Sequence, residues 1–240
     1  MFKGRIADIN VGFEEYYKLF HAYIPEFAAE FDKPDLVIEV TQKDIEEERA
    51  EELAAGGKDF PPGRFQMTRA FRKFGDAIPD FNAVVMHGCF VSVGDRGIAF
   101  IARSGTGKTT HMLLWQKLLG ERLQIINGDK PIVRFIDGGL FGYGTPWNGK
   151  EHFFVNGRAP LTDICIIERG EKNETLPVSK DEGALALIQQ VHTPRDPEQL
   201  TKTMQLVSRI SERCRFWKIR CNMDIEAAEV AYGKICGGYE

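Results

Sequence analysis

One short segment of this sequence, residues 102–110, has residue types and a spacing suited to phosphate chemistry. It reads Ala-Arg-Ser-Gly-Thr-Gly-Lys-Thr-Thr, which is the [AG]-x4-G-K-[ST] form of a phosphate-binding P-loop. In such a loop the glycines allow a tight turn that points backbone N–H groups at anionic oxygens. Lys108 would place a cation on the β- and γ-phosphates of a nucleotide, and the Thr109 hydroxyl would bind Mg²⁺. The predicted nucleotide-binding residues are Ser104, Gly105, Thr106, Gly107, Lys108, Thr109 and Thr110.

The residues on either side of this loop have the patterns of a strand and a helix. Residues 97–101 form a short apolar run typical of a β-strand, and residues 111–119 are rich in Leu, Met and Trp and precede Gly120. A helix that begins at the loop adds its positive N-terminal end to the phosphate site. Strand, glycine loop and helix, in this order, are the context that a P-loop requires.

A P-loop also needs an acidic partner, and Asp129 is the candidate. It follows the apolar run 123–126, where a strand beside the P-loop would deliver a carboxylate to Mg²⁺ or to an attacking hydroxyl. The alternative is an ordinary Asn-Gly-Asp-Lys turn. His87, on the strand pair that leads into the loop, could orient an acceptor or tune Asp129, although a lone histidine is more often structural. Lys130 is expected to be solvated.

The composition predicts an ordinary folded protein of the cytoplasm that binds neither nucleic acids nor membranes. The 240 residues are 43% hydrophobic and 28% charged, with a net charge of −4, so the chain lacks the positive excess that anionic polymers attract. We see no secretory signal and no apolar run long enough to span a bilayer. The five cysteines contain no Cys-x2-Cys pair, which indicates reduced thiols.

The order of the predicted elements favours an α+β fold, because many strands precede the helices. We divide the chain into an N-terminal β/α lobe, residues 1–80, and a P-loop core with C-terminal helices, residues 81–240. Asp181 and Asp196 are predicted to cap helices of the C-terminal third. The predicted strands of the core lie at 83–86, 90–93, 98–101, 123–126, 131–136, 140–143 and 164–167, and the second and third form a β-hairpin that enters the P-loop.

Two charged segments of the N-terminal lobe are predicted to be helices. Thr41 resembles an N-terminal cap of an acidic helix that runs to about Ala55. We interpret its acidic run, residues 46–48, as a solvated face rather than a docking surface. Residues 64–78 predict a basic amphipathic helix. Its cations Arg64, Arg69, Arg72 and Lys73 are expected to lie in water rather than to bind an anion.

Together these motifs resemble the HPr kinase/phosphorylase family, one of the P-loop groups with a phosphoenolpyruvate carboxykinase-like fold. The shared features are Met86-His87-Gly88, the hairpin, the glycine loop and Asn127-Gly128-Asp129, within residues 82–136. The resemblance implies a mixed, largely antiparallel sheet flanked by helices. It also implies that Lys108 holds the phosphates and that Thr109 and Asp129 bind Mg²⁺. Asp129 would be the base toward the acceptor hydroxyl, and His87 would lie near the active site.

The sequence also departs from this family. HPr kinases usually have two adjacent aspartates, whereas Lys130 follows Asp129 here, and residues 1–80 do not match the family's usual N-terminal domain. A C-terminal phosphorylase signature is not recognisable either. The resemblance therefore does not assign HPr itself as the substrate, and it does not imply the reverse, phosphorolytic reaction.

The motifs predict an ATP- and Mg²⁺-dependent kinase that phosphorylates a hydroxyl group, of Ser or Thr in a peptide or small protein or of a small molecule. The alternative is a nucleotide-binding regulatory or assembly protein with slow or no hydrolysis, which the missing second aspartate favours. The sequence leaves a homo-oligomer open. Residues 145–150 predict either a loop that places Lys150 near phosphate or a turn with a packed tryptophan. Arg195 is expected at the surface rather than on a phosphate.

Overall fold

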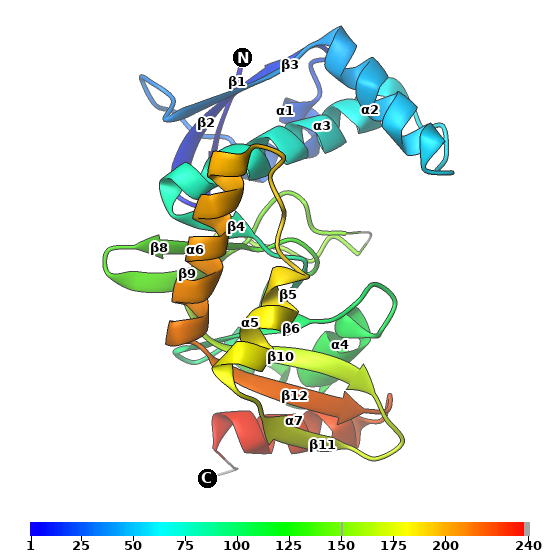
Figure 1. Cartoon of the computed structure of the whole chain (residues 1–240), viewed down its shortest axis with the longest axis vertical. Coiled ribbons are helices and arrows are strands. Elements are labelled where there is room, and N and C mark those ends of the chain that lie inside the picture. Colours follow the sequence, from blue (N-terminus) through cyan, green and yellow to red (C-terminus); the bar gives the residue numbers. More distant parts are fainter. Residues whose placement is uncertain (150, 238–240) are drawn as a thin grey trace.

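The structure, a computed structural model, describes residues 1–149 and 151–237 and consists of two sheets with helices packed on them (Figure 1). A three-stranded sheet lies near one end of the molecule, and a larger sheet of nine strands, counted over the described residues, forms the remainder. The predicted α+β class is confirmed. No helix in the described part of the chain is both long and apolar enough to cross a bilayer.

The first sheet and the helices beside it form what we call the N-terminal lobe, the elements from β1 to α3. Strand β1 pairs with β2 antiparallel, and β2 pairs with β3 parallel. Buried phenylalanine rings hold its interior together, with Phe20 stacked on Phe13 at 4.5 Å between ring centroids. Its elements are β1 (Phe2–Ile6), β2 (Ile9–Glu15), α1 (Phe20–Tyr23), η1 (Pro25–Phe27), β3 (Leu36–Val40), α2 (Gln42–Ala54) and α3 (Pro62–Ala77).

Helices α2 and α3 of this lobe are joined by ion pairs. The predicted cap at Thr41 is confirmed, because its hydroxyl accepts a hydrogen bond from the Asp44 N–H and the Asp44 carboxylate returns one. Glu48 is only 1% exposed and lies 3.0 Å from the Arg72 guanidinium, and Arg69 contacts Asp44 at 3.3 Å. The prediction of a solvated acidic face is therefore confirmed for Glu46 and Glu47, which are exposed, and wrong for Glu48. The cations Arg69 and Arg72 are partly buried and paired with carboxylates rather than simply solvated. The two helices pack against each other, and their opposite charges meet at the contact.

The second sheet is mixed and largely antiparallel, as predicted. Its strand order is β4-β8-β9-β10-β6-β5-β7. In addition, β12 pairs with residues 163–169 of β10, and β11 pairs with β12. Only the β10 pairings with β6 and β12 are parallel among its described strand pairs. The strands are β4 (Ala83–Val85), β5 (Gly88–Val93), β6 (Arg96–Ile101), β7 (Leu123–Asn127), β8 (Ile132–Ile136), β9 (Gly139–Tyr143), β10 (Arg158–Arg169), β11 (Glu174–Pro177) and β12 (Arg215–Cys221).

Helices cover both faces of this sheet (Figure 1). Apolar residues of α4 and α7 pack on one face, where Trp115 is fully buried against Phe100 at 5.3 Å between ring centroids. Residues of α5 and α6 pack on the other face against Ile101 and Phe216. The helices and short 3-10 turns of this part are η2 (Ile78–Phe81), α4 (Lys108–Leu119), η3 (Gly120–Arg122), α5 (Lys180–Ile188), α6 (Pro197–Arg213) and α7 (Ile225–Cys236).

The local elements that frame the predicted P-loop are confirmed. The β5–β6 hairpin leads into the loop, β6 ends at Ile101, and α4 begins at Lys108. Asp196 caps α6 as predicted, through hydrogen bonds from the N–H groups of the second and third helical residues. The cap of α5 was assigned to the wrong residue. Ser179 occupies it, and Asp181 lies in the first turn, where a negative charge also stabilises a helix N-terminus.

Candidate nucleotide and phosphoryl-transfer site

The loop between β6 and α4 has the backbone conformation that the glycine spacing predicts. Gly105 has a φ of 76° and Gly107 a φ of 126°, conformations that side chains with a Cβ rarely adopt. The chain thereby turns from the strand into the helix within a few residues, and α4 begins with its free N–H groups at the loop. This geometry is suited to holding an anion against backbone N–H groups.

Lys108 lies under this loop with its charge available for an anion. The side chain is 8% exposed, and its Nζ donates a hydrogen bond to the Ala102 carbonyl at 3.1 Å. Burial lowers the pKa of Lys108, and the nearby charge of Asp129 opposes this shift. Among the described residues no carboxylate lies within 4 Å of Nζ, so the ammonium has no ion-pair partner of its own in the described chain.

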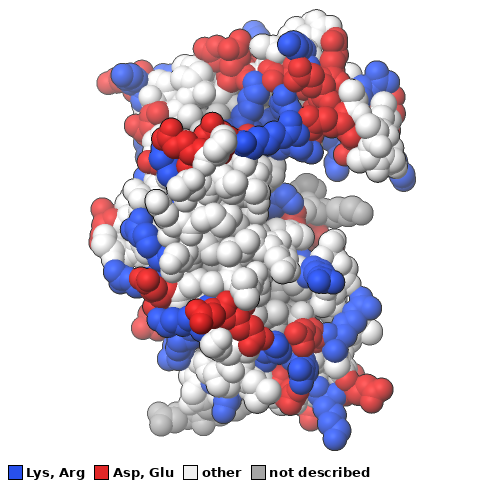
Figure 2. Space-filling model, viewed as in Figure 1, with Lys and Arg blue, Asp and Glu red and all other residues white. Residues whose placement is uncertain are grey.

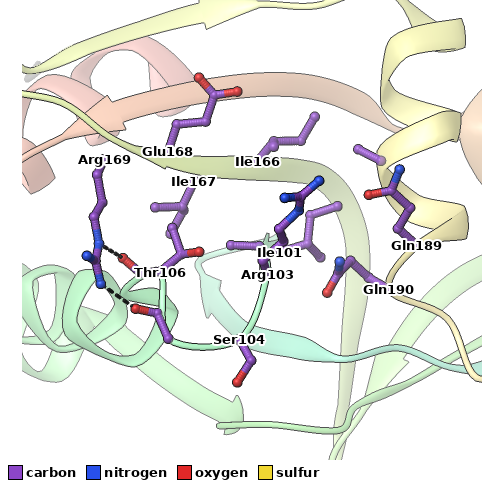
Figure 3. A pocket seen from close by; sticks show the side chains of 13 residues that line it. Ile101, Arg103, Ser104, Thr106, Ile166, Ile167, Glu168, Arg169, Gln189 and Gln190 are labelled. Carbon is purple, nitrogen blue, oxygen red and sulfur yellow. Dashed lines mark hydrogen bonds between the residues drawn. The ribbon is translucent and has the colours of Figure 1, made fainter.

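Arg169, at the end of β10, contacts the P-loop from outside (Figure 3). Its guanidinium donates hydrogen bonds to the Gly105 carbonyl at 2.5 Å and to the Thr106 carbonyl at 3.2 Å. Because it binds the carbonyls, it fixes two peptide planes of the loop. The Thr106 N–H in the first plane already donates to the Arg103 carbonyl at 3.2 Å, whereas the Gly107 N–H in the second plane has no partner among the described residues and is free for an anion. Sequence reasoning missed this residue, since an arginine at a strand end carries no motif.

If the loop holds the phosphates of ATP, as its sequence predicts, Arg169→Ala should weaken the binding of ATP by about 3- to 30-fold, because two hydrogen bonds that order the loop are lost. The measurement is the Kd for MgATP by fluorescence titration. Arg213→Ala, at an exposed arginine in the last turn of α6, is the matched control and should keep the wild-type Kd. Equal affinities in both variants would show that the loop keeps its shape without the Arg169 contact.

Asp129 is held in place by a buried asparagine that precedes it. Asn127, at the end of β7, is 0% exposed, and its side-chain oxygen accepts hydrogen bonds from the N–H groups of Asp129 at 2.9 Å and Lys130 at 2.6 Å. Its amide nitrogen donates to the Thr145 carbonyl at 3.1 Å. The turn chemistry expected of Asn-Gly-Asp-Lys is thus present, and it fixes the backbone of Asp129 at the end of β7.

Two basic side chains contact the Asp129 carboxylate. His87 Nε2 lies 3.4 Å from one oxygen, and Lys130 Nζ donates to the other at 3.0 Å. Burial raises the pKa of Asp129, but the His87 contact and the Lys130 charge outweigh burial, so the net pKa is lowered. We expected Lys130 to be solvated, but it is paired with Asp129. It also lies 5.6 Å from the centre of the Phe71 ring.

The predicted site residues come from two sides of the P-loop. In the sheet, β6 lies between β10 and β5, and β7 follows β5. The loop after β6 therefore has Arg169 of β10 on one side and Asp129, beyond β7, on the other. A cavity of about 660 Å³ opens between the loop, the end of β10 and the end of α5 (Figure 3).

A larger cleft, of about 1300 Å³, lies between the N-terminal lobe and the core and reaches Asp129 and Lys130. Figure 2 shows it as a notch in the outline of the molecule below the N-terminal lobe. Trp147 lines the cleft and packs on Phe71 and Phe74 of α3, at 5.1 and 5.3 Å between ring centroids. The predicted packed tryptophan is thus observed, whereas Lys150 lies outside the described residues.

Arg195 lies at the surface, as expected, and its side chain is 71% exposed. It donates two hydrogen bonds to the Glu51 carboxylate, at 3.1 and 2.9 Å. This pairing connects α2 to the segment before α6. Its charge is already matched, so the residue does not belong to the candidate site.

Two oxygen-bearing side chains are of the type that binds Mg²⁺. Thr109, in the first turn of α4, supplies a hydroxyl, and Asp129 supplies a carboxylate. The described residues contain no cluster of three or more His, Cys, Asp or Glu side chains that would hold a metal by themselves. Mg²⁺ is usually bound by one or two protein oxygens together with phosphates and waters, so these two residues would hold the ion only with a nucleotide.

Comparisons with known proteins add little to this geometry. No family model matches the chain, and no curated protein matches it. Among solved structures, the HPr(Ser) kinase/phosphatase from Coxiella burnetii is similar over 54% of this chain and 90% of that chain, with 11% identity and a TM-score of 0.30. This is a distant structural similarity, and at this TM-score it carries no argument about the fold or activity of the chain.

Proposed function

We propose that this protein is an ATP- and Mg²⁺-dependent kinase that transfers the γ-phosphate to a hydroxyl group. The observation that supports it is that the loop after β6, which leads to Lys108, and the turn after β7, which carries Asp129, lie on the two sides of β5, near enough for their charges to interact. Lys108 and the loop N–H groups would neutralise the phosphates, and Mg²⁺ held by Thr109 and Asp129 would supply further positive charge.

In the proposed reaction, the Asp129 carboxylate takes the proton of the acceptor hydroxyl. The hydroxyl oxygen then bonds to the γ-phosphorus, and the bond from this phosphorus to the bridging oxygen breaks, which leaves ADP. The Asp129 carboxylate is ionised at neutral pH, as this role requires, and its lowered pKa makes it a weaker base than a free carboxylate. His87, 3.4 Å from the carboxylate, would orient it.

The interlobe cleft supports a peptide acceptor rather than a small molecule. Its volume of about 1300 Å³ exceeds the ~300–1,000 Å³ of typical small-molecule sites. Aromatic side chains of both lobes line it, among them Phe60, Phe71 and Trp147, and such side chains provide much of the contact area in peptide recognition. A Ser or Thr of a chain segment lying in the cleft would present its hydroxyl to Asp129.

One observation favours the second candidate, a nucleotide-binding regulator without transfer. Lys130 pairs with the Asp129 carboxylate at 3.0 Å, where HPr kinases usually have a second aspartate. A carboxylate so paired is a weaker base.

The two candidates are separated by incubating the protein with γ-labelled MgATP and an array of Ser-, Thr- and Tyr-containing peptides. The kinase predicts Mg²⁺-dependent label on a subset of the peptides. Saturable ATP binding with neither labelled peptide nor released phosphate would instead favour the regulator.

A further inference from the structure

The cavity on the β10 side of the P-loop has features that phosphate binding does not use. Figure 3 shows Gln189 and Gln190 at the end of α5 on one side of it, Ile166 and Ile167 of β10 on another, and Ser104 of the loop below. Its apolar surface comes mainly from isoleucines and Ala186. The volume of about 660 Å³ is in the range of small-molecule sites.

Two side-chain amides face this cavity without a protein partner. Gln190 is 8% exposed, yet neither its side-chain amide nor that of Gln189 has a hydrogen-bond partner among the described residues. The Gln190 backbone is fixed, because its carbonyl accepts a hydrogen bond from the His87 N–H at 2.6 Å. The amide atoms of Gln190 are open to the cavity rather than sealed from solvent, so they are available to a ligand with matching donors and acceptors.

The negative charge of Glu168 beside the cavity is already paired, whereas the positive charge of Arg103 is not paired within the described part of the chain. Glu168 is paired with Arg220 at 3.2 Å and with Lys218 at 3.7 Å. Arg103 points into the cavity from the loop and has no carboxylate within 4 Å among the described residues (Figure 3). An anionic group is therefore accommodated at the loop side of the cavity, and an uncharged group with hydrogen-bonding edges at the glutamine side.

We infer that this cavity holds the nucleoside of the nucleotide, with Gln189 and Gln190 reading the edge of an adenine base. The inference rests on the proposed function for the position of the triphosphate. With the γ-phosphate beside Asp129 on the β7 side of the loop, the rest of the nucleotide extends toward β10, where this cavity lies. An amide reads adenine well, because it donates to a ring nitrogen and accepts from the exocyclic amine at once.

The test compares ATP, GTP and inorganic triphosphate by calorimetry on the wild type and on Gln190→Met, which removes the amide at nearly constant volume. We expect the wild type to bind ATP at least about 10-fold more tightly than triphosphate or GTP. Gln190→Met should lose about 3- to 10-fold in ATP affinity with no change for triphosphate. Gln189→Met, at an exposed position, should show the same selective loss and carries little risk to folding.

Gln124→Met, at an exposed glutamine of β7, is the control and should bind ATP as the wild type does. Equal affinity of the wild type for ATP and triphosphate, with both lost in Lys108→Ala, would overturn the base site and keep the phosphate site. Tighter binding of GTP than of ATP would overturn the adenine assignment. Absence of binding by all three ligands would overturn the proposed function together with this inference.

Discussion

Replacing Lys108 with alanine is expected to lower the affinity for MgATP by about 100-fold and to abolish phosphoryl transfer. The lysine begins the helix after the glycine loop, is buried, and has no carboxylate within 4 Å among the described residues, so under the proposed function it is the cation that holds the phosphates. A charge-assisted hydrogen bond to a phosphate contributes about 1.5–3 kcal/mol, and the upper part of this range corresponds to the expected loss. The measurement is the Kd for MgATP together with the rate of label transfer to the best peptide acceptor.

Lys117→Ala is the matched control for this prediction. Lys117 is an exposed lysine of the same helix, two turns beyond the loop, so its removal changes net charge equally without touching the site. Its affinity should equal that of the wild type. If Lys108→Ala binds MgATP with the wild-type Kd while its melting temperature is unchanged, the loop is not the site of phosphate binding.

Replacing Asp129 with asparagine is expected to slow phosphoryl transfer by about 10²- to 10⁴-fold, the usual contribution of a general base. Asparagine has nearly the same shape but cannot accept a proton from the acceptor hydroxyl. Because Lys108 and the loop N–H groups remain, the Kd for MgATP should change far less than the rate. Single-turnover transfer and equilibrium binding, measured on the same preparation, separate the two effects.

Asp95→Asn provides the comparison for this variant. Asp95 lies exposed in the turn between β5 and β6, and its substitution removes the same charge at a distance from the loop. It should transfer phosphate at the wild-type rate. An undiminished transfer rate in Asp129→Asn would remove this carboxylate from the mechanism, even if nucleotide binding were confirmed.

The elements beside the P-loop could be predicted from the sequence because local signals determine them. The apolar run before the loop, the glycines within it and Gly120 after the helix each constrain the backbone within a few residues. The cap at Asp196 is equally local, since the side chain binds N–H groups two and three residues away. The predicted bounds of these elements differ from the observed ones by only a few residues.

Contacts between elements far apart in the sequence could not be predicted in the same way. Nothing in the acidic run of α2 shows that Glu48 meets Arg72 of α3, because the pairing depends on how the helices cross. Strand β10 was predicted at 164–167 only. Its first half contains Pro160 and polar residues, and its pairing with β9 holds that half in the sheet.

The candidate site shows the same division. The loop, Lys108 and Asp129 were predicted from motifs, and they lie after β6 and β7, the two strands that flank β5 in the sheet. Asn127 was read only as part of a turn, and its role as a buried support of Asp129 depends on Thr145, 18 residues later. Arg169 and Gln190 carry no local signal, because only the packing of β10 and α5 beside the loop brings them to the same cavity.

The most direct measurement of the central claim is calorimetric titration of the wild-type protein with ATP, in the presence and absence of Mg²⁺. The structure leads us to expect one saturable site per chain, tighter with Mg²⁺ than without it, since Thr109 and Asp129 offer the ion only part of its oxygen shell and the phosphates complete it. Heats of dilution alone under both conditions would contradict the account.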